Sequence, residues 1–331
     1  DVYKRQIIVN VLPVNDPPEI GDQSIAAQED KAVVGVIAAN DIENDALTFS
    51  IASPPENGEV ALQSNGAYSY LADPDFNGTD SFDVVVTDPS GDSAKATITV
   101  FIGAENDAPL AVEDTGEVAQ GLPLLIDVLA NDTDPDGDDD PSTFELTEVS
   151  ITGVTGLSTS LGGSVSIVGN QLQFDPGTDF DELDTGDIAT VTVSYTLADN
   201  EGLTDSSTVT ITVTGSNDGP VAVADTGGGI EGSVQTIDVL ANDTDVDGAD
   251  DASNFTLLSA TITEVTGLAG ATGTVAVVDN QLQFDPGTDL DELDTGEVAT
   301  VTVSYTLAED EGVEDSCTET ITVWGTNGVP G

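Results

Sequence analysis

Carboxylates separated by a single residue recur in three short stretches of this sequence, and these are the residues best suited to chemistry. The stretches are Asp41-Ile42-Glu43-Asn44-Asp45, Asp132-Thr133-Asp134-Pro135-Asp136-Gly137-Asp138 and Asp243-Thr244-Asp245-Val246-Asp247-Gly248. In an extended loop alternate side chains project to the same side, so each acid-x-acid pair places two carboxylates together. Without a cation these charges repel by kilocalories at partly screened distances. Ca²⁺ takes about six to eight oxygen ligands, so the pattern favours calcium binding.

The two later stretches also match the first half of an EF-hand loop, D-x-D-x-D-G. The twelfth position of that loop requires a bidentate glutamate, but here it holds Thr143 in one stretch and Asn254 in the other. No amphipathic helix is expected on either side of the stretches. The EF-hand interpretation is therefore rejected.

Two further polar elements accompany each stretch in a fixed order along the chain. An Asn-Asp linker precedes it, and an acid-initiated turn follows an alternating strand after it. The linkers are Asn15-Asp16, Asn106-Asp107 and Asn217-Asp218, and the turns are Asp88–Gly91, Asp199–Gly202 and Glu309–Gly312. Turn formation is the competing explanation, because Asp-Pro, Asp-Gly and Asn-Asp pairs make turns well. The shared order of three clusters favours metal binding, as does the gathering of acids in loops while the strands are rich in Thr and Val.

The linkers divide the chain into repeated modules. Residues 171–198 recur at 281–308 with few changes, so that Gln281 aligns with Gln171. The linker asparagines recur at positions 15, 106, 217 and 327. Each of these intervals is as long as a whole domain and too long for a single solenoid turn. We expect a preceding tail and linker at 1–16, domains at 17–106, 107–217 and 218–327, and the start of a next linker at 328–331.

Within each module the polar and apolar residues alternate with a period of two. Thr190–Leu197 alternates strictly, as does its copy at 300–307. Thr, Val and Ile dominate these runs, and Gly, Asn, Asp and Pro mark the turns between them. About seven short strands per hundred residues is typical of an antiparallel β-sandwich. The expected fold class is all-β, with tandem antiparallel β-sandwich modules arranged end to end.

The charge balance excludes several partners. The sequence has 4 Lys and Arg against 63 Asp and Glu, and its formal net charge is −59. Nucleic acid and anionic membrane surfaces are excluded, because binding phosphate requires Lys and Arg. Self-repulsion destabilises such a chain unless cations neutralise it. An acidic, salt-adapted spacer without specific metal sites is one alternative. No run approaches 18 apolar residues, so no membrane insertion by this segment is expected.

The composition also argues against catalysis, and we expect no enzymatic activity, no catalytic residue and no organic cofactor. Histidine is absent, which excludes Ser-His-Asp and Cys-His nucleophilic sets. The one cysteine, Cys317, aligns with Ser207 of the sister module and is a strand residue. Carboxylate pairs hydrolyse glycosides in some enzymes, but aromatic residues are only 5% here. A glycan-binding or protein-binding module is a second alternative, although no loop clusters Tyr, Trp or Arg.

The ordered trio of linker, D-x-D loop and post-strand acid resembles the cadherin-like and VCBS-type tandem repeats of large bacterial surface adhesins of the RTX type. The first module, with Tyr68-Ser69-Tyr70 and Phe76–Phe82, is similar to the cadherin-like form. The other two, with Val128–Asp132 and Val239–Asp243, are similar to its longer relatives. The resemblance implies Ig-like or cadherin-like sandwiches with Ca²⁺ held where one module meets the next. The ligand sets that it implies are Asn15, Asp16, Asp41, Glu43 and Asp88; Asn106, Asp107, Asp134, Asp136 and Asp199; and Asn217, Asp218, Asp245, Asp247 and Glu309.

Two departures from that pattern are visible. Asn327 is followed by Gly328, so the last linker lacks its acid, and the glycine-rich nonapeptide Ca²⁺ repeats of such adhesins are absent. Two other acid-rich segments, Asp179–Asp187 and Asp289–Glu297, lie before a strand with no linker nearby. We expect these to be solvated loops or short turns, with a further cation site as the alternative.

The resulting functional expectation is a non-catalytic, Ca²⁺-rigidified extender and adhesion segment. It would belong to a large secreted or cell-surface bacterial protein that mediates cell-surface or biofilm adhesion. A cell-surface glycan or protein would be bound by other parts of the parent chain. Because Ile7, Val9 and Val11 begin the sequence within an expected strand, we expect the chain to be a fragment of that longer protein.

Overall fold

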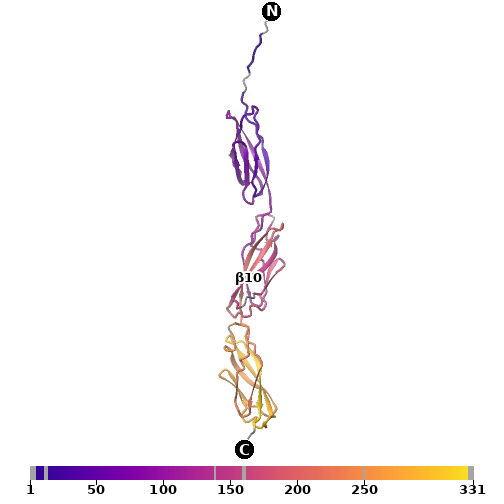
Figure 1. Ribbon diagram of the computed structural model, residues 1–331, viewed down its shortest axis with the longest axis vertical. Coiled ribbons are helices and arrows are strands. Elements are labelled where there is room, and N and C mark those ends of the chain that lie inside the picture. The colour runs from indigo at the N-terminus through magenta and orange to yellow at the C-terminus, as the bar shows by residue number, and fades with distance from the viewer. Residues whose placement is uncertain (1–4, 11–13, 138, 159–161, 249, 327–331) are drawn as a thin grey trace. The chain divides into compact units, whose positions relative to one another are not determined.

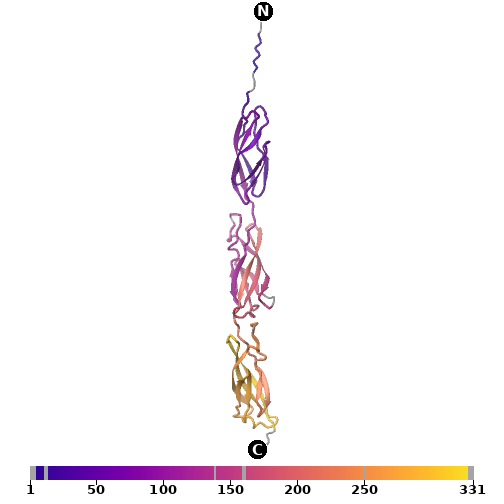
Figure 2. The same ribbon diagram turned by 90° about the vertical axis from the view of Figure 1, so that its left-hand side faces the viewer.

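The computed structural model describes residues 5–10, 14–137, 139–158, 162–248 and 250–326 (Figure 1 and Figure 2). Three expectations from the sequence lie outside these residues: the last linker at Asn327, the next linker at 328–331 and the carboxylate of Asp138. The described residues form strands and no helix, so the expectation of an all-β fold is confirmed. Accordingly, they include no helix that is long and apolar enough to cross a membrane.

The first sandwich consists of a four-stranded and a three-stranded sheet, drawn in indigo and purple in Figure 1. The larger sheet has the order β1 (Gln23–Gln28), β7 (Ser93–Gly103), β6 (Gly78–Thr87) and β3 (Thr48–Ser53). The smaller sheet has the order β2 (Val33–Val36), β5 (Ala67–Ala72) and β4 (Gly58–Leu62). Neighbouring strands are antiparallel, except that β1 runs parallel to β7. Tyr70, Phe82 and Ile98 are at most 1% exposed and belong to one core.

The second and third sandwiches share one topology, with a four-stranded and a three-stranded sheet each. In the second sandwich the larger sheet has the order β10 (Glu145–Thr155), β13 (Ile188–Ala198), β14 (Thr204–Thr214) and β8 (Asp114–Ala119). Its smaller sheet has the order β11 (Ser164–Val168), β12 (Gln171–Asp175) and β9 (Leu124–Ile126). In the third sandwich the larger sheet has the order β17 (Thr256–Thr266), β20 (Val298–Ala308), β21 (Glu314–Trp324) and β15 (Asp225–Ile230). Its smaller sheet has the order β16 (Gln235–Ile237), β19 (Gln281–Asp285) and β18 (Thr274–Val278). As in the first sandwich, the first strand is parallel to the last: β8 to β14, and β15 to β21.

The alternating runs of the sequence are the central strands β13 and β20. Along β13 the side chains of Val191, Val193, Tyr195 and Leu197 are at most 1% exposed, while the threonines and serine between them are half-buried. Fully burying such an apolar side chain stabilises the fold by about 1.5–3 kcal/mol. This period-two burial confirms the sandwich prediction. The strand β13 ends at Ala198, directly before the acidic turn that begins at Asp199.

A buried tyrosine donates a hydrogen bond to the backbone of the segment that follows each of the two inner linkers. Tyr195 Oη donates to Val112 O at 2.7 Å, and Val112 N donates to Asp132 Oδ1 at 2.7 Å. The first aspartate of this acidic stretch therefore has a structural task. The third sandwich repeats both bonds with Tyr305, Val223 and Asp243.

Internal contacts divide the described residues into two compact units. One unit holds the first sandwich together with loop residues of the second from 133–144 and 198–204. The other holds the remainder of the second sandwich and the third sandwich. The linkers at Asn106 and Asn217, with the loops around each, consequently lie within one unit apiece.

One acid of the first sandwich is buried for a structural reason, and this yields a stability prediction. Asp80 is 5% exposed and accepts hydrogen bonds from Glu56 N, Asn57 N and Tyr70 Oη at 3.1, 3.1 and 2.8 Å. Burial alone would raise the pKa of Asp80, but the bonds from Tyr70 and the backbone lower it. Asp80→Ala should therefore destabilise the sandwich by about 3 kcal/mol in urea unfolding at neutral pH, because several buried donors lose their acceptor.

The matched control for that substitution is Asp83→Ala. Asp83 forms an ion pair with Lys95 at 2.7 Å, and the Lys95 side chain is 56% exposed. Such surface pairs contribute about 0–1 kcal/mol, so the control should shift the urea midpoint little. Equal losses for the two variants would contradict the structural role of Asp80.

Candidate metal centres

Each described Asn-Asp linker is tied by its asparagine amide to the acid that follows the alternating strand. The three bonds are Asn15 Nδ2 to Asp88 Oδ2 at 2.8 Å, Asn106 Nδ2 to Asp199 Oδ2 at 2.8 Å and Asn217 Nδ2 to Glu309 Oε1 at 2.6 Å. These residues are 73 to 93 positions apart in the sequence. The parallel pairing of the first strand with the last places the linker near the turn from which the last strand starts.

The linker also reaches the D-x-D loop through its backbone. The amide of the linker aspartate donates to the second acid of the loop: Asp16 N to Glu43 Oε2 at 3.4 Å, Asp107 N to Asp136 Oδ2 at 2.8 Å and Asp218 N to Asp247 Oδ2 at 2.7 Å. The three sequence elements named as ligand sets are therefore adjacent at all three linkers. Their use as metal ligands is a further step, argued below.

The first acid of each D-x-D loop uses one oxygen and leaves the other available. Its Oδ1 accepts the amide two residues later: Asp41 from Glu43 at 3.0 Å, Asp134 from Asp136 at 2.8 Å and Asp245 from Asp247 at 2.9 Å. The Oδ2 atoms of these three aspartates are buried and have no hydrogen-bond partner among the described residues. A buried carboxylate oxygen without a donor is the expected state of a cation ligand before the cation binds.

At the first inner junction, oxygens of two further acids lie close to the linker aspartate, Asp107. One oxygen each of Glu29, Asp107 and Asp136 lies within 4.8 Å of the others, and Glu29 is 1% exposed. Glu29 Oε1 accepts the Glu105 amide at 2.5 Å, while Glu29 Oε2 has no partner in the part of the chain that the structure describes. Glu29 precedes the linker in the sequence and Asp136 follows it, and all three acids belong to the same compact unit.

The sequence did not point to Glu29. It also did not point to Asp30 and Asp75, which form a second group with Asp107. The missing signal is the parallel pairing of the first and last strands. Gln28 at the end of β1 pairs with Gly103 at the end of β7, so Glu29 emerges beside the linker. An alternating pattern does not reveal which strands are neighbours, and the expectation of antiparallel sheets concealed this pair.

At the second inner junction one cluster consists entirely of buried acids. Asp247, Asp250 and Glu309 are 2%, 7% and 4% exposed, and one oxygen of each lies within 4.8 Å of the others. Their unpartnered oxygens, as far as the described residues show, are Asp247 Oδ1, Glu309 Oε2 and both carboxylate oxygens of Asp250. The Oδ1 atom of Asn217 is likewise buried without a partner there. Several oxygens thus lack a donor in one small region.

The acid-rich segment Asp179–Asp187 also reaches this junction, which the sequence left as an alternative. Asp184 has an oxygen within 4.8 Å of oxygens of Asp250 and Glu311. The equivalent segment of the third sandwich, Asp289–Glu297, makes local bonds, such as Gly273 N to Asp289 Oδ2 at 3.2 Å. The two copies therefore differ in their surroundings.

Like charges and burial alter the ionisation of these clusters. Burial, followed by the charges of Asp245 and Asp218, raises the pKa of Asp247 to about 6. Burial, and then the charge of Asp310 above all, raises the pKa of Asp250. At the first inner junction, burial and the charges of neighbouring acids raise the pKa of Asp107. In the absence of a cation, a raised pKa favours protonation of these carboxyls, which reduces the repulsion between them.

The residues present fit a hard divalent cation. The clusters offer carboxylate oxygens, with the Asn217 carbonyl beside them, and these are the ligands that Ca²⁺ and Mg²⁺ prefer. Ca²⁺ accepts irregular shells at about 2.3–2.6 Å, whereas Mg²⁺ demands near-ideal octahedral geometry. Ligands contributed by separate loops and by a linker meet the first requirement better than the second.

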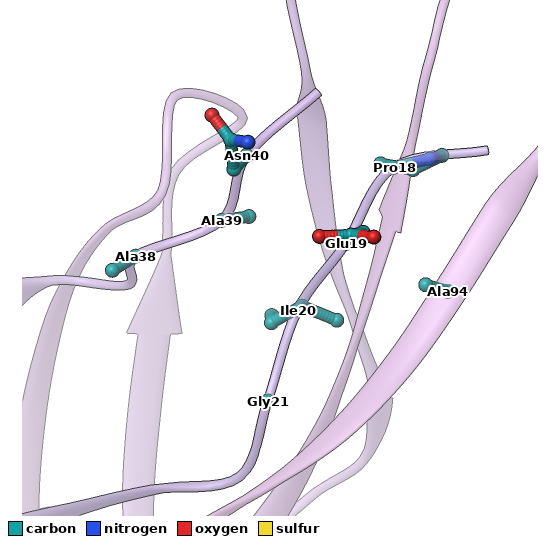
Figure 3. A pocket seen from close by; sticks show the side chains of 8 residues that line it. All are labelled: Pro18, Glu19, Ile20, Gly21, Ala38, Ala39, Asn40 and Ala94. Atoms are coloured by element: carbon teal, nitrogen blue, oxygen red, sulfur yellow. The ribbon is translucent and has the colours of Figure 1, made fainter. Parts of the chain in front are cut away.

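One cleft lies in the first sandwich, away from the inner junctions (Figure 3). Its volume is about 650 Å³, and it is lined by Pro18–Gly21, Ala38–Asn40 and Ala94. Glu19 and Asn40 exchange both backbone hydrogen bonds, at 2.7 and 2.9 Å, across its wall. Small side chains and one carboxylate line it, so it offers little of the aromatic surface that dominates binding hot spots.

Comparison with known proteins supports the fold assignment. Residues 15–101, 106–212 and 217–323 each match the family model of the bacterial Ig domain. No match was found among curated proteins. The structure is similar to the extracellular cadherin domains 1–5 of protocadherin gamma B2, with a TM-score of 0.57 and 16% identity over 95% of this chain and 61% of that one.

Two mouse structures are similar over nearly their whole length. One is the EC22–24 fragment of cadherin-23, with a TM-score of 0.55 and 17% identity over 95% of this chain and 100% of that one. The other is the EC1–3 fragment of protocadherin-24, with a TM-score of 0.53 and 16% identity over 96% and 99%. At these identities the likeness shows the fold alone.

The resemblance to cadherin-like bacterial repeat modules is thereby confirmed, whereas the VCBS-type and RTX-type assignments stay predictions. Repeats of this class are typically non-catalytic structural modules on the extracellular side or surface of the cell. Because the family matches cover most of the sequence, the chain belongs to the bacterial Ig domain family, as three tandem domains with a cadherin-like fold.

Proposed function

We propose that the chain is a non-catalytic extender and adhesion segment of a large secreted or cell-surface bacterial protein, and that Ca²⁺ at its domain junctions makes it rigid. One observation carries the proposal. At each inner junction the linker, the D-x-D loop and the post-strand acid are hydrogen-bonded into one constellation in which buried carboxylate oxygens have no donor among the described residues.

Rigidity follows from the origin of the ligands. At the first inner junction Glu29 precedes the linker and Asp136 follows it, while Asp107 belongs to the linker itself. An ion held by all three resists bending, because any change of angle must lengthen an ion–oxygen contact. Removing the ion leaves like charges in place, and their repulsion favours separation.

The ion concentration that such sites require suits the extracellular space. Extracellular Ca²⁺ modules bind with dissociation constants of about 10⁻⁴–10⁻³ M, well above cytosolic calcium levels. The proposal therefore includes secretion, domain boundaries at the Asn-Asp linkers, and an adhesion target bound by other parts of the parent protein. Biofilm adhesion is the setting that fits an acidic, calcium-dependent extender.

The absence of catalysis belongs to the same proposal. The sequence contains no histidine, and its one cysteine, Cys317, is a partly buried residue of β21. Apart from buried Glu319, the carboxylates with raised pKa values lie at the junctions or around buried tyrosines, and none of them lines the cleft of Figure 3. They are better placed to hold a cation than to transfer a proton.

Small-angle X-ray scattering tests the rigidity directly. In about 10 mM Ca²⁺, a saturating level for sites of this class, the chain should scatter as one conformation, and excess EDTA at matched ionic strength should broaden its distance distribution. Asp136→Asn should loosen only the first inner junction, and Asp247→Asn only the second.

Glu148→Gln is the matched control, because it removes one charge from an exposed position of β10. It should scatter like the wild-type chain. A purely salt-adapted spacer predicts instead that NaCl restores the compact distribution as well as Ca²⁺ does. That result, with both junction variants unchanged, would reject the proposal.

A further inference from the structure

Two equivalent acids at the two inner junctions have different partners. Asp139 of the second sandwich accepts Asn200 Nδ2 at 2.9 Å and Thr143 Oγ1 at 3.0 Å. Asp250 is its counterpart in the third sandwich, at the same place after the D-x-D loop. Both carboxylate oxygens of Asp250 lack a hydrogen-bond partner within residues 250–326 and the other described ranges, although the residue is only 7% exposed.

Two sequence differences accompany the contrast: Asn254 stands where the second sandwich has Thr143, and an acid stands where it has Asn200. The residue equivalent to Asn200 is Asp310, because each directly follows the acid that begins the post-strand turn. A carboxylate replaces the amide donor at that position, and its charge raises the pKa of Asp250 after burial. At this position the second sandwich has a neutral amide donor, and the third sandwich has a second carboxylate that a cation can neutralise.

The surrounding residues supply further oxygens at that position. Asp184, from the loop of the preceding sandwich, and Glu311, from the post-strand turn, each have an oxygen within 4.8 Å of the Asp250 oxygen. A backbone bond holds the two sandwiches together here, because Gly248 N donates to Glu182 O at 3.1 Å. The linker adds another, from Asn217 N to Thr185 Oγ1 at 3.1 Å.

We propose that Asp184, Asp250 and Glu311 form an additional divalent-cation site that exists only at the second inner junction. It rests on the proposed function in that it assumes a calcium-loaded chain, and it lies beside the cluster of Asp247, Asp250 and Glu309. The cation takes the place that the Asn200 amide fills in the second sandwich. Asp250 belongs to both clusters, and its two unpartnered oxygens would be available to both sites.

The first inner junction lacks this site for two reasons. The Oδ1 atom of its Asp139 already accepts hydrogen bonds from Asn200 and Thr143. In addition, the four cation clusters found in the described residues include neither Asp139 nor Glu201, which is the counterpart of Glu311. The two junctions therefore differ by one ion, and the second is the more strongly calcium-dependent of the two.

Native mass spectrometry of the whole chain in calcium, with and without substitutions, tests this site. Asp310→Asn restores the amide donor and should lower the number of bound Ca²⁺ ions by one. Asp184→Asn should also lower it by one, because it removes a ligand outright. Asp247→Asn should remove an ion from the neighbouring cluster, and Glu148→Gln should change nothing.

Thermal unfolding in EDTA gives a second reading, of the metal-free chain, beside the ion count that distinguishes a metal site from a structural role. Asp310→Asn should raise the melting temperature of the metal-free chain, because Asp250 gains a donor. The mirror-image change Asn200→Asp should lower it without adding an ion. If wild type and Asp310→Asn bind equal numbers of ions while Asp247→Asn binds fewer, the additional site is disproved and the proposed function stands. If the wild type binds none, the proposed function itself fails.

Discussion

Saturating Ca²⁺ should raise the midpoint of thermal unfolding of this chain by about 10–20 °C relative to EDTA at equal ionic strength. A ligand at 100 times its dissociation constant stabilises the folded state by about 2.7 kcal/mol per site. One to two such ions per domain, at about 4 °C for each kcal/mol in a domain of this size, give the expected shift. Differential scanning calorimetry measures it directly.

The shift should be specific to calcium and dependent on the junction acids. Mg²⁺ should reproduce only part of it, because the ligands come from separate loops and form an irregular shell. NaCl at equal ionic strength should reproduce the general screening of a net charge of −59 and no more. Asp136→Asn and Asp247→Asn should each reduce the calcium-dependent shift. A shift below about 2 °C, or one that NaCl matches, would contradict ion binding at the junctions.

Glu319→Val should stabilise the third sandwich by about 3 kcal/mol at pH 8, because Glu319 is a buried acid in an apolar core. The residue is 0% exposed, and neither of its carboxylate oxygens has a hydrogen-bond partner from any residue that the structure describes. Burial first, and then the charge of Asp225 on the adjacent β15, raises the pKa of Glu319 to about 7. The equivalent residue of the second sandwich, Val209, is also 0% exposed, so valine fits this position.

The pH dependence of this gain has a definite sign. In the unfolded chain Glu319 titrates near its ordinary value of 4.5, and in the folded chain near 7. Between those values the folded state binds more protons, so the wild type loses stability as pH rises from about 4.5 to about 7 and stays less stable above. The advantage of Glu319→Val should therefore be small at pH 4.5 and complete at pH 8.

Urea unfolding of the whole chain across this pH range, with calcium saturating, measures the difference between variant and wild type. Glu319→Gln keeps the size of the side chain and should abolish the pH dependence with a smaller gain. The reverse substitution Val209→Glu should introduce the same pH dependence into the second sandwich. A constant difference between Glu319→Val and wild type at all pH values would show that Glu319 does not titrate in this range.

The fold was largely predictable from sequence because its cause is local. The alternation of Thr190–Leu197 indicates which side chains face the core. The repeat of domain length predicts how many times the unit occurs. The adjacency of Asn106 to Asp199 was implied by the family resemblance and not by the strand pattern. What alternation does not encode is which strands are neighbours, and the parallel pairing of β1 with β7 was not foreseen.

The missed site residues depend on that pairing and on contacts between domains. Glu29 lies beside the linker only because the first strand runs along the last. Asp184 meets Asp250 only because the loops of consecutive sandwiches touch through Gly248 and Glu182. The substitution of Asp310 for Asn200 was visible in the sequence, but its meaning depends on the partner of each residue. Buried Glu319 falls at an inward position of β21, which a charge count does not reveal.

The central claim is that the junction acids are calcium sites, and counting bound ions tests it most directly. Equilibrium dialysis against about 1–10 mM Ca²⁺ in about 0.5 M NaCl suppresses diffuse counterion binding while leaving specific sites filled. The number of ions per chain, measured by elemental mass spectrometry, should saturate at one or more for each inner junction and fall in Asp136→Asn and Asp247→Asn but not in Glu148→Gln. A count of zero, or a count that all three substitutions leave unchanged, would contradict the account.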